Sequence, residues 1–229
     1  MNFKIIQSGL NRESLRESQS MEQLKKLSNV MGVRYIRLEN QPYNDKAPVD
    51  EIFKGWKDFY RGSTKDYNTP GLTDRHYGAW LSHKQSIMIG FSDKGHSLIC
   101  ESDCKILDLE LFKNRLIESV NYFNENDTYP LIRFEPPSKP EGFITNFGKK
   151  VSDNIFECDG IMCGHCYLIH EKHKDFFYKL YNDEGWTTPD DWLLFNFRER
   201  NIPFLSFKET LTSQYDGISE IDRVNKKYS

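Results

Sequence analysis

The stretch that decides the fold is Ser97-Leu98-Ile99-Cys100-Glu101-Ser102-Asp103. Its first four residues are typical of a short buried strand, and two carboxylates follow that strand at once. Because side chains alternate along a strand with a period of two, we expect Glu101 and Asp103 to face the same way. Two hard oxygen ligands on one side suit Mn²⁺ or Mg²⁺, which complete their coordination with phosphate oxygens. A solvated turn after the strand is the alternative interpretation.

Strand and helix patterns alternate on both sides of this stretch. Apolar and β-branched runs predict further strands at 3–6, 33–38, 131–134, 166–169 and 204–207. Helical periodicity predicts helices at 13–27, 50–60, 74–91, 108–123, 171–181 and 190–200, and Pro- and Gly-rich composition predicts loops at 61–73 and 135–154. Such alternation is typical of an α/β sandwich with a mostly parallel central sheet, in which ligands bind beyond the carboxyl ends of the strands.

Composition excludes several classes of protein. The chain has 229 residues, the length of a single domain, and aromatic side chains make up 14% of it, which argues against intrinsic disorder. The mean hydropathy is −0.69, and no apolar run approaches the ~20 residues of a transmembrane helix. The N-terminal apolar run turns polar at Gln7, so we expect no signal peptide and a cytoplasmic protein. The five cysteines are then expected to be reduced.

Charge is distributed unevenly along the chain. The net charge is −3, but residues 1–90 carry 14 basic and 10 acidic side chains, while residues 91–160 carry 8 and 13. This balance excludes a strongly basic nucleic-acid footprint over the whole chain and leaves a local basic face open in the first third. The acidic middle is where a cation-dependent site is expected.

The predicted helix at 74–91 and the cysteines near residue 160 offer two further candidate sites. The helix presents Ser82 and His83, which could line a pocket, although an isolated histidine is more often structural. Cys163 and Cys166 form a C-x-x-C pair with Cys158 nearby, which would suit a redox dithiol or a zinc site. The strand pattern directly after Cys166 argues against the redox interpretation, and buried apolar packing is the simplest one.

Two aspartates open the predicted helix at 190–200. Pro189, Asp190 and Asp191 make a good first helical turn, which alone explains their presence. Trp186 and Trp192 flank them, and aromatic rings beside carboxylates are also typical of a sugar-binding cleft. One of the two aspartates could then act as a general base on an acceptor hydroxyl. Residues 212–221 are polar and predict a C-terminal tail.

Read together, these segments resemble glycosyltransferase family 25, the lipopolysaccharide-biosynthesis type. The resemblance rests on five short motifs in order over residues 73–221: Gly78-Ala79-Trp80-Leu81-Ser82-His83, Leu98-Ile99-Cys100-Glu101-Ser102-Asp103, Gly164-His165-Cys166-Tyr167-Leu168-Ile169, Pro189-Asp190-Asp191, and Gln214 with Ser219-Glu220-Ile221. Ser102 stands where the family has an aspartate between two acidic residues. The family's N-terminal arginine is matched most nearly by Arg12 or Arg16.

The resemblance implies a GT-A-like three-layer α/β/α fold and an inverting transfer of a sugar from a nucleotide sugar, with a UDP-sugar as the expected donor. Glu101 and Asp103 would hold Mn²⁺ or Mg²⁺ against the donor diphosphate, and Arg12, Ser82 and His83 would help to bind the donor. Asp191, ahead of Asp190, would deprotonate the acceptor. The single domain would divide into a donor-binding half, residues 1–104, and an acceptor-side half, residues 105–229.

The resemblance is compatible with more than one acceptor, and also with a non-catalytic role. A surface glycan or lipopolysaccharide-type saccharide is the expected acceptor. A phage-type transferase that glycosylates a modified base in DNA is a second possibility. A non-catalytic member that binds a glycan or a partner protein, with Trp186 and Trp192 as the sugar platform, is a third. A plain zinc-binding module is a further alternative, with less support from the sequence.

Overall fold

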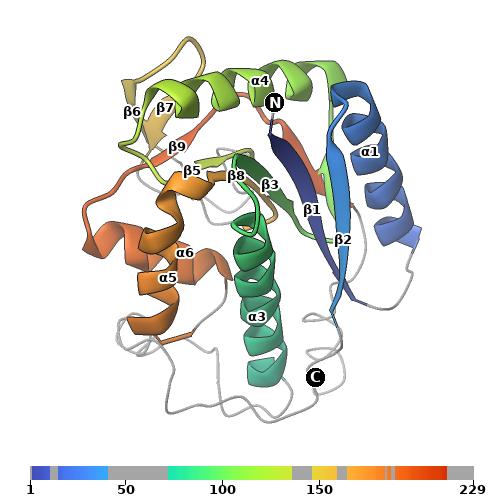
Figure 1. Cartoon of the computed structure of the whole chain (residues 1–229), viewed down its shortest axis with the longest axis horizontal. Helices are drawn as coiled ribbons and strands as arrows, with labels where there is room; N and C mark the ends of the chain where they lie inside the picture. Colours follow the sequence, from blue (N-terminus) through green and yellow to red (C-terminus); the bar gives the residue numbers. More distant parts are fainter. Residues whose placement is uncertain are drawn as a thin grey trace.

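An eight-stranded sheet forms the middle layer of the computed structural model, which describes residues 2–10, 15–40, 72–135, 146–158, 164–183, 185–186 and 189–215. The strand order is β2-β1-β3-β8-β5-β9-β7-β6. The strands are β1 (Phe3–Leu10), β2 (Arg34–Asn40), β3 (His96–Cys100), β5 (Leu131–Arg133), β6 (Phe147–Lys150), β7 (Phe156–Cys158), β8 (Cys166–His170) and β9 (Phe204–Ser206). All of them except β8 and β7 point the same way, so the sheet is mostly parallel, as predicted (Figure 1).

Helices cover both faces of the sheet. They are α1 (Leu15–Met31), α3 (Leu72–Gly90), α4 (Leu109–Glu125), α5 (Lys174–Asp183) and α6 (Pro189–Glu199), with a short 3₁₀ turn η2 (Glu171–His173) before α5. One apolar core packs α3, α5 and α6 against one face, and a second packs α1 and α4 against the other. The predicted three-layer α/β/α sandwich is therefore confirmed.

The alternation of strand side chains separates these two cores. Ile6 and Ile99 belong to the core under α3, α5 and α6, whereas their neighbours Ile5 and Leu98 belong to the core under α1 and α4. The central strands β3, β5 and β9 are buried along their whole length because both faces of the sheet are covered there. This explains why the strands read as short continuous apolar runs in the sequence.

Local sequence signals predict α3 and α4 well. Aspartate is a favoured helix cap, which predicts a cap at Asp108, and its carboxylate does cap α4 by accepting the N–H groups of Glu110 and Leu111. Trp80, Ile87 and Phe91 lie buried along the predicted inner face of α3. For α1, the sequence pattern predicts an inner face made by Leu15, Leu24 and Leu27. Leu24 and Leu27 are buried as predicted, but Leu15, in the first turn, is 78% exposed, so the prediction is wrong there.

Four short strands, β4, β6, β7 and β10, are absent from the sequence prediction. Thr212–Gln214 forms β10, which pairs antiparallel with β4 (Cys104–Ile106), so this part is a strand and not a tail. The predicted loop at 135–154 contains β6, and β7 was not predicted. The predicted helix at 50–60 lies outside the described residues.

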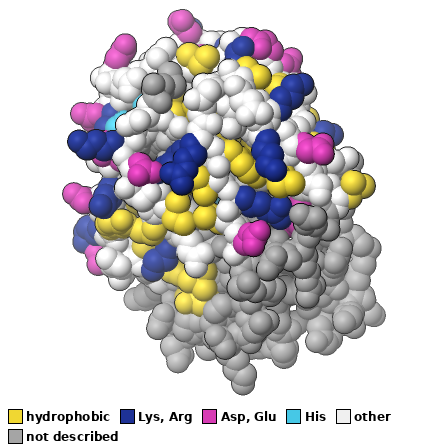
Figure 2. All heavy atoms as spheres, turned by 45° about the vertical axis from the view of Figure 1, so that its right-hand side comes forward, with side chains coloured by type: hydrophobic (Ala, Val, Ile, Leu, Met, Phe, Trp, Pro, Cys, Tyr) yellow, Lys and Arg dark blue, Asp and Glu magenta, His cyan; other side chains and the backbone are white. Residues whose placement is uncertain are grey.

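The surface facing the viewer in Figure 2 mixes charges of both signs. Lys and Arg side chains surround a central strip of hydrophobic side chains, and Asp and Glu lie among them and at the margin. On this face the positive side chains do not merge into one continuous patch. No described helix combines the length and the hydropathy that a membrane span requires.

Candidate active site

A tight turn carries the two predicted metal ligands from β3 to β4. The N–H of Cys104 donates to the carbonyl of Glu101 over 3.2 Å, which closes the turn Glu101-Ser102-Asp103-Cys104. The backbone of this turn is tied to its neighbours, because Glu101 N–H donates to the His165 carbonyl and Tyr215 N–H donates to the Asp103 carbonyl, both over 2.9 Å. Since residues 101–103 form a turn and not a strand, the period-of-two argument for a common direction of Glu101 and Asp103 is wrong.

The side chain of Glu101 lies at the centre of a hydrogen-bond network. Its Oε1 is 3.0 Å from Nε2 of His83 on α3, and its Oε2 accepts a long bond of 3.5 Å from Nε2 of Gln214 on β10. The other ring nitrogen of His83, Nδ1, is 2.9 Å from the hydroxyl of Tyr167 on β8. α3 and β10 therefore meet at the carboxylate of Glu101, and β8 joins the network through His83.

This network holds Glu101 in its ionised form. Burial raises the pKa of Glu101, but the hydrogen bond and charge of His83, with smaller contributions from His165 and Gln214, outweigh it and bring the pKa below the ordinary 4.5. Burial keeps the pKa of Tyr167 well above its ordinary value, so the phenol keeps its proton beside Nδ1 of His83. An ionised Glu101 accepts only, so Nε2–H of His83 donates to it.

The carboxylate of Glu101 is also reachable from outside. Its side chain is 27% exposed, whereas that of His83 is only 5% exposed. Each carboxylate oxygen has two lone pairs, so the bonds from His83 and Gln214 leave acceptor capacity on both oxygens. An ionised, oriented, partly open carboxylate is a hard oxygen ligand of the kind that Mn²⁺ and Mg²⁺ prefer, and it fits the predicted cation. Asp103, on the same turn, is 8% exposed.

The structure places the other predicted site residues less completely. Ser82 precedes His83 on α3 and is half-buried. Asp190 and Asp191 lie in the first turn of α6, as the helix-start pattern predicted, but their side chains lie outside what the structure describes. Arg12 lies outside it as well. Their proposed roles stay predictions.

Trp186 and Trp192 do not form a sugar platform. They are only 2% and 1% exposed and belong to the core under α3, α5 and α6. Trp192 stacks on Tyr181 with ring centroids 4.2 Å apart, and Trp186 packs edge-on against Tyr77. The apolar packing of α6 against α3 explains both tryptophans, so the expectation of an aromatic sugar cleft here is wrong.

Two members of the network, Tyr167 and Gln214, were not predicted as site residues. Both belong to the motifs that carried the resemblance, but nothing in their spacing indicates contact with residue 83 or 101. Tyr167 is opposite Ile99 in the β3–β8 ladder, and Gln214 is opposite Cys104 in the β4–β10 ladder. Their approach depends on strand pairings that join distant parts of the chain, which a single sequence does not reveal.

The cysteines also behave differently from the C-x-x-C prediction. Cys166 opens strand β8 and is fully buried, so it does not begin a helix as a redox cysteine would. Cys163 lies outside the described residues. Cys158 is buried on β7, and its thiol donates to the Phe204 carbonyl over 3.5 Å. Cys166 instead meets Cys100 and Cys104, a group that the sequence did not single out.

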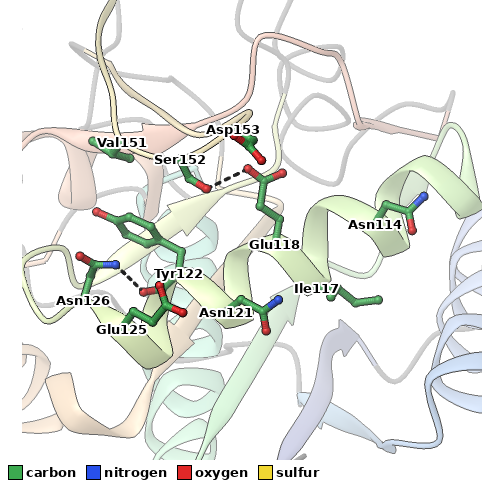
Figure 3. Close-up of a pocket in the computed structure, with 10 residues that line it drawn as sticks. All are labelled: Asn114, Ile117, Glu118, Asn121, Tyr122, Glu125, Asn126, Val151, Ser152 and Asp153. Carbon is green, nitrogen blue, oxygen red and sulfur yellow. Dashed lines mark hydrogen bonds between the residues drawn. The ribbon is translucent and has the colours of Figure 1, made fainter.

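A groove of about 440 Å³ lies elsewhere, between α4 and the segment that follows β6 (Figure 3). Its carboxylate Glu118 already accepts bonds from Ser152 Oγ, at 3.1 Å, and from the backbone and side chain of Asn154, at 2.7 and 3.0 Å. None of its lining residues belongs to the Glu101 network. These bonds tie the segment after β6 to α4, and we assign the groove a structural role.

Comparisons with known proteins agree with this fold. No family profile matches the sequence, and neither does any curated protein. Among solved structures, the chain is similar to a glycosyltransferase involved in the glycosylation of the major capsid of PBCV-1, with a TM-score of 0.50, 11% identity and 98% of each chain covered. It is more distantly similar to the catalytic domain of Drosophila beta1,4galactosyltransferase 7, with a TM-score of 0.43, 10% identity and 95% and 72% of the two chains covered. The first of these likenesses shows a shared fold, and it does not single out family 25.

Proposed function

We propose that the protein is a glycosyltransferase that transfers a sugar from a nucleotide sugar, a UDP-sugar in the first instance, to an acceptor hydroxyl with inversion and with the help of a divalent cation. The observation that carries the proposal is the oriented, ionised carboxylate of Glu101, held by His83 and Gln214 directly beyond the carboxyl end of β3. This is where α/β sheets bind ligands. The similarity of the fold to a glycosyltransferase supports the same conclusion.

The donor would bind at the Glu101–Asp103 turn. Glu101 and Asp103 would hold Mn²⁺ or Mg²⁺, which when bound neutralises charge on the leaving diphosphate. His83 and Gln214 fix the orientation of Glu101, so its charge is in place before the donor arrives. Ser82 and Arg12 are proposed to contact the donor itself.

The acceptor would be activated from α6. Asp191, with Asp190 as the second choice, takes the proton of the acceptor hydroxyl. The acceptor oxygen then forms a bond to the anomeric carbon from the face opposite the diphosphate, and the bond from that carbon to the diphosphate oxygen breaks. A single displacement of this kind inverts the configuration. Residues 1–104 would provide the donor side and residues 105–229 the acceptor side.

The proposed acceptor is a surface glycan or a lipopolysaccharide-type saccharide. The mixed charge on the face shown in Figure 2 gives no support there for a DNA acceptor, because phosphate-backbone binding needs clustered Lys and Arg. A saccharide acceptor offers hydroxyl groups in abundance and requires no such basic surface.

Isothermal titration of UDP and UDP-sugars, with and without Mn²⁺, tests the proposal. We expect Mn²⁺-dependent binding by the wild type and at least a tenfold loss in Glu101→Gln, which keeps the size of the side chain but removes its charge. Glu110→Gln is the matched control, because Glu110 is an exposed residue of α4 that pairs with Lys113 on the surface. If Glu101→Gln and Glu110→Gln bound UDP compounds equally well in the presence of Mn²⁺, Glu101 would not be a residue of the donor site. If no nucleotide sugar bound the wild type, the transferase proposal would fall.

A further inference from the structure

Three thiols meet directly beside the Glu101 turn, on the face of the sheet that α1 and α4 cover. Cys100 ends β3, Cys104 begins β4 and Cys166 begins β8, and all three side chains are fully buried. Their sulfur atoms all lie within 4.8 Å of one another. Among the described residues this is the one group of three or more Cys, His, Asp or Glu side chains that comes so close together.

Strand pairing fixes the positions of these sulfurs. Cys100 and Cys166 are direct partners in the antiparallel β3–β8 ladder. The bond from Glu101 N–H to the His165 carbonyl shows that they form a non-hydrogen-bonded pair, the kind whose side chains approach most closely. Cys104 is held by the turn bond to Glu101 and by its pairing with Gln214. The three thiols are therefore set by backbone bonds on three strands.

The spacing of the sulfurs matches that of metal-bound thiolates. Zn²⁺ binds cysteine sulfur at about 2.3 Å, so two thiolates on one tetrahedral ion lie about 3.8 Å apart. The distance between the sulfurs of Cys100 and Cys166 is 3.7 Å. To bind the same ion, the third sulfur, Sγ of Cys104, would have to move by less than about 1 Å, because all three pairs of sulfurs lie within 4.8 Å.

We propose that Cys100, Cys104 and Cys166 are the three protein ligands of a thiophilic metal ion such as Zn²⁺. Soft thiolates select this class of metal over the hard Mn²⁺ or Mg²⁺ proposed for the donor. The ion would tie together both ends of the turn that carries Glu101 and Asp103, because Cys100 and Cys104 flank it. It would therefore act as a structural clamp behind the donor site, and it does not depend on the proposed transferase activity.

The test measures Zn²⁺ binding by the reduced full-length protein after removal of metal with a chelator. We expect one Zn²⁺ per chain, and we expect Co²⁺ in its place to give a thiolate-to-metal charge-transfer band. Cys104→Ser should lose both the Zn²⁺ binding and the Co²⁺ charge-transfer band. Cys158→Ser, which replaces a buried cysteine outside the group, should keep both. Glu101→Gln should also keep both, which separates this site from the donor site.

The wild type alone can overturn the proposal, even where a variant fails to fold. Absence of stoichiometric Zn²⁺ binding by the reduced wild type would refute it, whatever the variants show. Equal Zn²⁺ binding by Cys104→Ser and Cys158→Ser, with unchanged circular dichroism, would refute the assigned ligands. Recovery of a Cys100–Cys166 disulfide from the purified protein, together with no Zn²⁺ binding after reduction, would show an oxidisable thiol pair in place of a metal site.

Discussion

At the scale of single residues, the chemistry depends on one carboxylate and the groups that hold its charge. Glu101 was identifiable from sequence because a strand that ends in two acidic residues is a recognisable pattern, and His83 was a weaker candidate. Their contact over 3.0 Å links the two motifs physically. A hydrogen bond to a charged group contributes about 1.5–3 kcal/mol, so His83 has enough influence to decide whether Glu101 is ionised.

Replacing His83 should make donor binding more sensitive to acid. The pKa of Glu101 is lowered chiefly by His83 against the raising effect of burial, so His83→Leu should move that pKa upward. Mn²⁺-dependent binding of UDP should then weaken by about tenfold at neutral pH and fail at a higher pH than in the wild type. Titrations from pH 4 to 8 measure both effects, with His173→Leu as the control. A pH profile identical to that of the wild type would mean that His83 only fills space.

A second histidine should make the fold itself sensitive to acid. Burial lowers the pKa of His96 to about 4, and His170 and Lys172 add to this, while the bond to Asn124 opposes it. Since the folded pKa lies below the ordinary 6.5, the stability that neutral His96 provides is complete above pH 6.5 and is lost as the pH falls toward 4. The loss should reach about 2 kcal/mol at pH 5. Urea unfolding at pH 7 and pH 5 should show a smaller difference for His96→Gln, and an equal difference would contradict this account.

At the scale of elements, the sequence predicted those that carry their own local signal. The cap at Asp108 and the apolar stripes of α3 and α4 identify long helices without reference to the rest of the chain. β4 and β10 have three residues each, too few for a period to be visible, and β10 is defined only by its pairing with β4. The same limit applies to the candidate site. Glu101 could be predicted from its own strand, but the contacts of Gln214 and Tyr167 depend on pairings between strands that are far apart in the sequence.

A buried ion pair should link β5 to β8. Nε of Arg133 donates to Oε2 of Glu135 over 3.1 Å, both side chains are fully buried, and Oε1 of Glu135 accepts the N–H of Cys166 over 3.0 Å. Glu135→Gln should lower the free energy of unfolding by about 3–5 kcal/mol, because it removes the negative charge that faces the buried Arg133 guanidinium. Urea denaturation measures this loss. Glu110→Gln, on an exposed pair with Lys113, should cost under about 0.5 kcal/mol. Similar losses of unfolding free energy in both variants would show that the buried ion pair stabilises the fold no more than the exposed pair does.

At the scale of the whole molecule, the single sheet couples the two cores. Trp80, Trp186 and Trp192 all lie in the core under α3, α5 and α6, whereas Leu116 lies in the core under α1 and α4 on the other face. The two cores share every central strand, since neighbouring residues of one strand point into opposite cores. Because both cores pack against the same strands, neither core can stay folded once the other has unfolded. This coupling crosses the boundary at residue 104 between the two proposed functional halves.

Leu116→Ala tests this coupling directly. The side chain is fully buried, so its truncation should cost about 2–5 kcal/mol. Tryptophan fluorescence reports chiefly on the opposite core, while far-ultraviolet circular dichroism reports on all helices. In a cooperative molecule both probes give coincident urea transitions, and Leu116→Ala lowers both midpoints equally. If the fluorescence midpoint stayed at its wild-type value while the dichroism midpoint fell, the two faces would unfold independently. The clamp proposed at Cys100, Cys104 and Cys166 would then stabilise only the core that contains those thiols.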